Sequence, residues 1–162
     1  CCNSCAAAIF LTQGQQNPKT TFLHCQVPCG IFDDPAMVQE LQQAATTIRK
    51  AMIQSQAMNE EQQTSDHPSQ PAMEAMNQVI RWVMTKEDHA NQIIRLVSEY
   101  CLCQRVKPTL FATPAEYHQA LQVHHAVLQA AMKTKQTMNV QACDDLDHAL
   151  ADMAKMYIKT TE

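Results

Sequence analysis

The chain has 162 residues, 46% of them apolar, and a formal net charge of −4, which is typical of one globular domain. The acidic balance argues against nucleic acid as the main partner, and no apolar run approaches the roughly 20 residues that a membrane-spanning helix needs. Only two glycines are present and aromatic residues are sparse, which favours helix over sheet.

Residues 1–23 differ in character from the rest of the chain. They contain an apolar run at residues 6–11 and a polar stretch at residues 12–21, after three cysteines at the start: Cys1, Cys2 and Cys5. The apolar run is short and no basic residue precedes it, so it is not a complete signal peptide. We expect this segment to be an N-terminal arm or a pro-segment, with cysteines whose role the sequence leaves open.

A compact cysteine motif follows, with the sequence His24-Cys25-Gln26-Val27-Pro28-Cys29-Gly30-Ile31-Phe32-Asp33-Asp34. Thiolates are soft donors that select transition metals, and an adjacent imidazole can complete the ligand set. Pro28 and Gly30 are suited to a turn around Cys29. Taken alone, two cysteines at this spacing are more often a small disulfide loop, a zinc half-site or buried thiols than a redox centre.

Residues 34–162 carry the spacing of amphipathic helices. The first helix is predicted to start near Asp34, as its N-cap, with Pro35 at the first helical position, and polar residues 57–70 to form a loop. A second helix is predicted from Ser69, as a cap, to Lys107, which precedes a proline. The apolar stripe of the first helix comprises Val38, Leu41, Ala45, Ile48 and Met52. That of the second comprises Met73, Met76, Ile80, Val83, Glu87, Ala90, Ile94, Val97 and Cys101.

Two further helices complete the pattern. Thr113 and Glu116 form a capping box that opens a helix with the stripe Tyr117, Leu121, His124, Leu128 and Ala131. Residues 133–139 are expected to turn the chain into a fourth helix, with the stripe Leu146, Leu150, Met153 and Tyr157. Asp144, Asp145 and Asp147 lie in its early turns, where carboxylates favour the helix dipole. The sequence therefore predicts an all-α, antiparallel up-down four-helix bundle, with Val83 and Leu121 in its core.

Other metal-binding residue types have simpler interpretations. His124 and His125 are adjacent, so they point about 100° apart on a helix and cannot easily share a metal. We expect core or surface histidines there, and a buried polar or interface group at Glu87. Three cysteines are expected to be buried free thiols: Cys101, Cys103 and Cys143.

The pattern H-C-x-x-P-C-G resembles the nickel-binding hook of the nickel superoxide dismutases, and here the hook spans residues 24–33. The likeness continues to the C-terminus, through Lys86-Glu87, Lys107-Pro108 and Tyr117-His118. It implies an enzyme that converts superoxide to oxygen and hydrogen peroxide, built as a homohexamer of four-helix bundles.

The resemblance also implies a ligand set. Cys25 and Cys29 would supply two thiolates to nickel, and the backbone nitrogen of Cys25 with the α-amino group of His24 would complete a square plane. The His24 ring would be the axial ligand. These three residues are therefore the expected catalytic and metal-binding residues. The hook residues around them are Gln26, Pro28, Gly30 and Phe32.

Three features depart from the family pattern. Phe32 stands where the family often has tyrosine, and Gln26 where it often has aspartate, so both remove polar groups near the metal. In addition, 23 residues precede His24, and if they are retained the amine ligand is lost.

These departures leave alternatives open. One is a metal-free structural subunit of a larger assembly that keeps its arm, and another is a zinc- or copper-binding module. The hook variant resembles that of marine microbes and algae, which implies a cytoplasmic or plastid location, although the sequence itself gives no compartment.

Overall fold

The computed structural model describes residues 33–67, 69 and 71–158. Within these ranges the protein is all-α, which confirms the predicted class. The predicted arm and nearly all of the hook lie outside the described residues. The helical elements are α1 (Pro35–Thr64), α2 (Ala72–Arg95), the π-helical η2 (Leu96–Arg105), the short 3-10 helix η3 (Pro108–Leu110), α3 (Pro114–Gln136) and α4 (Gln141–Ala154).

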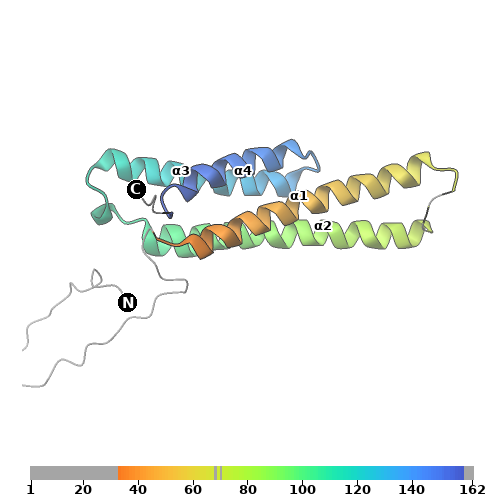
Figure 1. Ribbon diagram of the computed structural model, residues 1–162, viewed down its shortest axis with the longest axis horizontal. Helices are drawn as coiled ribbons and strands as arrows, with labels where there is room; N and C mark the ends of the chain where they lie inside the picture. The colour runs from red at the N-terminus through yellow and green to blue at the C-terminus, as the bar shows by residue number, and fades with distance from the viewer. Residues whose placement is uncertain (1–32, 68, 70, 159–162) are drawn as a thin grey trace, which may run out of the picture.

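The four long helices form the antiparallel up-down bundle that the sequence predicts (Figure 1). α1 packs against α2 and α4, and α3 packs against α2 and α4. The beginning of α1, η2 and the end of α4 meet at one end of the bundle, where the backbone N–H of Asp34 donates to the carbonyl of Tyr157 at 2.8 Å. The hook therefore joins the bundle at this end. None of the described helices has the length and apolar character needed to cross a membrane.

The start of α1 confirms one prediction and corrects another. Asp34 occupies the N-cap position and Pro35 follows it, but the Asp34 side chain makes no capping hydrogen bond. Its carboxylate is instead buried, with the residue 4% exposed. A predicted helix cap has thus become a buried charge, which requires partners inside the bundle.

The predicted loop at residues 57–70 is largely wrong, because α1 continues to Thr64. Glutamate and glutamine have good helix propensity, and a polar segment without glycine or proline can extend a helix into solvent. Ser69 does not cap α2, whose N-cap is Pro71. The backbone N–H of Ser69 instead donates to Glu61 Oε1 at 2.9 Å. The α1–α2 hairpin consequently projects beyond α3 and α4 (Figure 1).

The remaining helix signals hold with small shifts. The Thr113 hydroxyl accepts from the Glu116 N–H at 3.2 Å, which is one of the two bonds of a capping box. Glu116 Oε2 accepts from the backbone N–H of Ala112 at 3.0 Å, one residue before the position that the box requires. α3 runs to Gln136, so the predicted turn begins a few residues later than residue 133. The last helical segment before Pro108 ends at Arg105, in agreement with the predicted stop at Lys107-Pro108.

The predicted core is right in two helices and misplaced in the other two. All five stripe residues of α1, and Leu146, Leu150, Met153 and Tyr157 of α4 and its end, are buried. In contrast, Met73, Met76 and Ile80 are exposed, and Val83 and Leu121 are only half-buried. The buried residues of α3 are Ala120, His124, Val127, Ala131 and Thr134.

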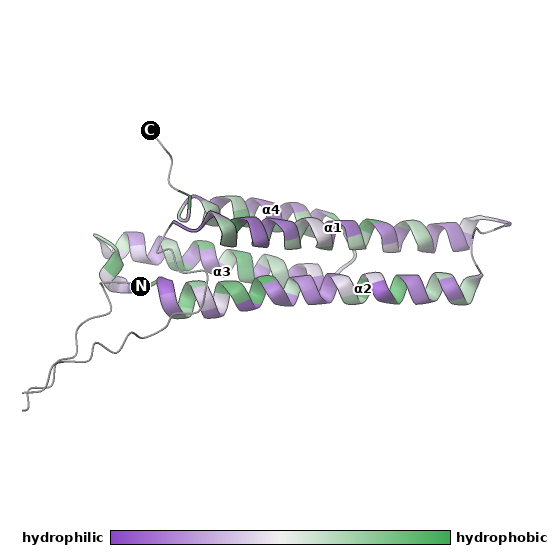
Figure 2. Ribbon diagram, turned by 60° about the horizontal axis from the view of Figure 1, so that its bottom comes forward, coloured by the Kyte–Doolittle hydropathy of each residue, from purple (hydrophilic) through white to green (hydrophobic). Residues whose placement is uncertain are grey.

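The physical reason for this error is twofold. In α3, the buried face consists mainly of small and polar side chains. At two positions of the predicted stripe, Leu121 and Leu128, the buried residue is instead the preceding one, Ala120 or Val127. The N-terminal half of α2 belongs to the projecting hairpin, where α1 is its main packing partner. Figure 2 shows apolar and polar residues alternating along this projecting part. The placement of Val83 and Leu121 in the core is therefore wrong.

Candidate functional site

Asp33 is the described residue of the hook, and Asp34 follows it at the start of the bundle, so the site must be built from the bundle side. The predicted ligands, His24, Cys25 and Cys29, lie outside the described residues, as do their neighbours: Gln26, Pro28, Gly30 and Phe32. Among residues 33–67, 69 and 71–158, no group of three or more His, Cys, Asp or Glu side chains is placed to hold a metal ion.

The bundle residue that follows the hook in the chain belongs to a buried group of polar side chains, which we call the Asp34 cluster: Asp34, Tyr100 and Arg105. The Tyr100 hydroxyl donates to Asp34 Oδ2 and accepts from the Arg105 guanidinium. The guanidinium also pairs directly with Asp34 Oδ2 at 3.4 Å, and its central carbon lies 4.6 Å from the centroid of the Tyr100 ring. The buried carboxylate is thereby paired with a cation and accepts a hydrogen bond from a hydroxyl.

The π-helical geometry of η2 makes this convergence possible. In an α-helix, residues five apart point about 140° away from each other. In η2 the backbone hydrogen bonds span five residues, as in the bond from Val106 N–H to the Cys101 carbonyl at 2.9 Å, so the turn is wider. Tyr100 and Arg105 therefore lie on one side of the segment. Such π-helical turns are rare and are frequent at functional sites.

A second polar chain lies beside the first. The ring of His124 places Nδ1 2.6 Å from the Ala120 carbonyl, so this nitrogen carries the proton. Its Nε2 consequently accepts from the Tyr157 hydroxyl, at 2.6 Å. The same hydroxyl is hydrogen-bonded with the Cys101 thiol. His124 is thus a satisfied core histidine, as predicted, while His118 and His125 are exposed.

Burial sets the protonation states of these groups. Burial lowers the pKa of His124, so its ring is neutral in the folded protein. Burial, together with the hydrogen bond to Asp34, raises the pKa of Tyr100 to about 12, and burial raises that of Cys101 to about 11. The Cys101 thiol is therefore protonated at neutral pH and is neither a nucleophile nor a metal ligand in this state.

The other two described cysteines differ from each other. Cys143 is buried with its sulfur 3.5 Å from that of Met52, as a core thiol. Cys103 is exposed, which corrects the prediction that all three thiols are buried. Cys103 lies on the opposite side of η2 from Cys101, because two helical residues that are two positions apart point in nearly opposite directions.

At the C-terminal end of α3 the buried polar group is Lys86 and not its neighbour Glu87, which was expected to be a buried polar or an interface group. Lys86 Nζ donates to the carbonyls of Thr134 and Lys135 at 3.0 and 2.9 Å, and so closes the C-terminus of α3. Glu87, which was expected within the apolar stripe, is half-exposed and pairs with Lys86 at 2.8 Å. This is a structural contact between α2 and α3.

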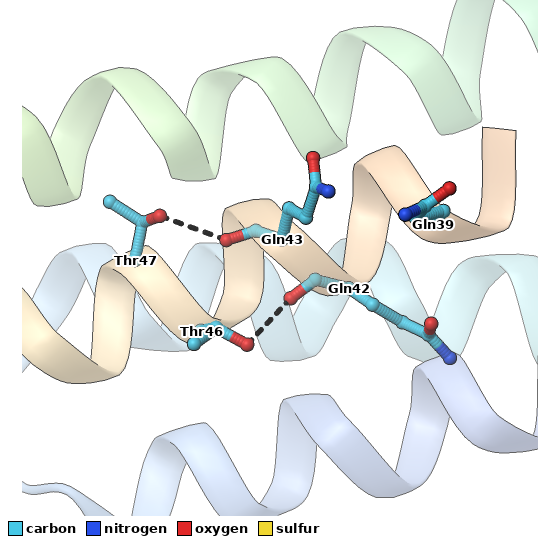
Figure 3. Close-up of a pocket in the computed structure, with 5 residues that line it drawn as sticks. All are labelled: Gln39, Gln42, Gln43, Thr46 and Thr47. Carbon is cyan, nitrogen blue, oxygen red and sulfur yellow. Dashed lines mark hydrogen bonds between the residues drawn. The ribbon is translucent and has the colours of Figure 1, made fainter. Parts of the chain in front are cut away.

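One surface hollow of the described bundle has no ionisable group in its lining. Figure 3 shows this hollow, which is lined by five polar residues of α1: Gln39, Gln42, Gln43, Thr46 and Thr47. The Thr46 and Thr47 hydroxyls donate back to carbonyls of the same helix, each at 2.9 Å. None of these five side chains ionises, so this hollow supplies no acid, base or metal ligand. A second hollow lies along α2 and η2, from Asp88 to Glu99.

Sequence reasoning found the hook but missed Tyr100 and Arg105. Residues five apart do not share a face of an α-helix, so the spacing of Tyr100 and Arg105 gives no reason to pair them. Only the expectation of a π-helical turn would have brought the two together.

The comparisons with known proteins bear on the same segment. A family model described as nickel-containing superoxide dismutase matches residues 19–161, which includes the hook and the bundle. Neither the curated proteins nor the solved structures gave a match.

Proposed function

The chain belongs to the nickel-containing superoxide dismutase family, and from this premise we propose that it is a nickel-dependent superoxide dismutase that converts superoxide to oxygen and hydrogen peroxide. One observation carries the proposal. The segment that matches the family includes the complete hook motif, with His24, Cys25 and Cys29. In the chain, that motif is followed at once by Asp34, a member of the buried Asp34 cluster.

The donor set of the hook fits nickel, the cofactor of this family. Two thiolates, from Cys25 and Cys29, and nitrogen donors from His24 and the backbone would make a soft, anionic set that suits nickel and favours its oxidised state. When bound, nickel supplies the one-electron oxidation and the one-electron reduction that dismutation needs. Two of the described thiols, Cys101 and Cys143, do not compete for this role, because they are buried and protonated at neutral pH.

The residues of this chain would then hold and shield the site. By their positions in the hook, Phe32 and Gln26 would offer an apolar ring and a neutral amide where the family often has ionisable groups. At the same end of the bundle, Lys107 is exposed and follows η2. An exposed cation there raises the local concentration of a small anion such as superoxide.

The direct test replaces the thiolates. In a chain that begins at His24, Cys25→Ser and Cys29→Ser should each abolish nickel-dependent activity. The helical circular dichroism should stay, because the hook precedes the bundle in the chain and the core of the described residues comes after it. Cys103→Ser is the matched control, since it removes an exposed thiol of the bundle. Activity that survives either hook substitution would contradict the proposed ligand set.

We also propose that the chain assembles with copies of itself, as the homohexamers of the family imply. Four large apolar side chains lie within one face of α2 and are 50–80% exposed: Met73, Met76, Ile80 and Met84. Such a stripe is typical of an interface. A Met76→Glu variant should lower the mass measured by light scattering, whereas Glu74→Gln, on a neighbouring exposed position, should not. An unchanged mass in Met76→Glu would rule out this face.

A further inference from the structure

We propose that the Asp34 cluster is a lock that fixes where and in which direction the hook leaves the bundle, so that Asp34, Tyr100 and Arg105 are positioning residues for the metal site. The proposal rests on the function proposed above. It goes beyond that function because it assigns a role to bundle residues that are not metal ligands.

The first argument is covalent reach. Asp34 lies five residues after Cys29, and five extended residues span at most about 17 Å. The Cα atom of Cys29, which carries the second thiolate, must therefore lie within that distance of the Cα atom of Asp34. A shift or rotation of the chain at Asp34 is transmitted directly to the hook, since only a few residues separate the two.

The second argument is the number of attachments at this point. The backbone N–H of Asp34 donates to the Tyr157 carbonyl at 2.8 Å, and its carboxylate is bound by the Tyr100 hydroxyl and the Arg105 guanidinium. These contacts come from two different parts of the bundle, η2 and the end of α4. Together they fix both the position and the orientation of the residue, which a single backbone bond would not.

The third argument is that this arrangement gives up three local preferences at once. Asp34 forgoes the capping bond that its position offers. η2 forgoes α-helical geometry. A charged pair with side chains only 4% and 6% exposed is buried, although a buried ion pair is weak support for stability. Local rules are broken together mainly at functional or strained sites, so we assign the cluster to geometry rather than to stability.

The test uses the chain that begins at His24, with Asp34→Asn and Arg105→Lys as variants and Tyr100→Phe as a milder one. The control is Lys86→Met, which removes an equally buried cation at the far end of α3. Two readouts are independent of activity. One is the paramagnetic resonance spectrum and the nickel affinity of the loaded chain. The other is hydrogen exchange of residues 25–36 in the metal-free chain, under conditions where each variant is fully folded.

We expect the cluster variants to lower nickel affinity about 10–100-fold, as supporting residues of metal sites do, to alter the spectrum, and to accelerate exchange at residues 25–36. Lys86→Met should destabilise the bundle and leave all three unchanged. If the cluster variants leave the spectrum, the nickel affinity and the exchange rates unchanged, as the control does, the proposed role of the Asp34 cluster is wrong. If the unmodified chain fails to bind nickel, the proposed function fails, and the exchange measurement still decides whether the lock exists.

Discussion

The buried Tyr157 hydroxyl offers a sharp test of the packing at the hook end of the bundle. Tyr157 is fully buried, and its hydroxyl donates to His124 Nε2 at 2.6 Å. Tyr157→Phe keeps the ring and removes only the oxygen, so it opens little space. It leaves a buried imidazole nitrogen without its donor, which costs about 1–3 kcal/mol. The free energy of unfolding should fall by this amount.

Urea unfolding followed by helical circular dichroism measures this change. With a slope of about 1–3 kcal/mol per molar urea, the midpoint should fall by about 1 M while the slope is unchanged. The control is Tyr117→Phe, whose half-buried ring lies 5.8 Å from that of Phe111, and it should stay within about 0.5 kcal/mol. A double-mutant cycle with His124→Leu should give a coupling of about 0.5–3 kcal/mol. Equal small effects for both tyrosines would refute the hydrogen-bonded arrangement.

Three further predictions concern the bundle. Burial lowers the pKa of His124, so below about pH 6.5 the unfolded chain binds more protons at this residue than the folded protein does. The contribution of His124 to the free energy of unfolding should therefore be fully present above that pH and should fall on acidification, by at most about 1.4 kcal/mol per pH unit. A His124→Gln variant that keeps the whole pH dependence would contradict this. Leu146→Ala, at a fully buried position, should lower the free energy of unfolding by about 2–5 kcal/mol, and Leu121→Ala, at a half-buried position, should lower it clearly less. Equal losses in urea unfolding would place both leucines in the core. Brief alkylation followed by peptide mass spectrometry should modify exposed Cys103 before buried Cys101, and the reverse order would show that η2 is turned the other way.

The sequence predicts α1 and α4 well because their large apolar residues recur with helical spacing and their partners cover that whole face. Val38 and Leu146 are examples, and both are buried. In α2 the same rule fails, because Met73 and Ile80 have helical spacing in a hairpin that projects beyond the other two helices. Spacing indicates which residues share a face, whereas the lengths of the neighbouring helices decide whether that face is covered.

The site shows a similar division. The hook is a local motif, so residues 24–33 could be read directly from the sequence. The Asp34 cluster joins residues 66 and 71 positions apart through a π-helical turn, and neither the separation nor the turn has a sequence signal. Lys86, which closes α3, was missed for a related reason, because a buried lysine is satisfied by carbonyls of another helix.

The central claim is that His24, Cys25 and Cys29 hold a redox-active nickel ion, and N-terminal processing tests it most directly. A free amine at His24 is a good donor to nickel, whereas with Leu23 attached that nitrogen belongs to a peptide bond. Nickel content and superoxide dismutation should be measured for a form that keeps residues 1–23 and for one that begins at His24. The account predicts stoichiometric nickel and activity only in the second form. Full nickel content and activity in the longer form would contradict the proposed ligand set, and no nickel or activity in either form would contradict the claim itself and favour a metal-free structural subunit.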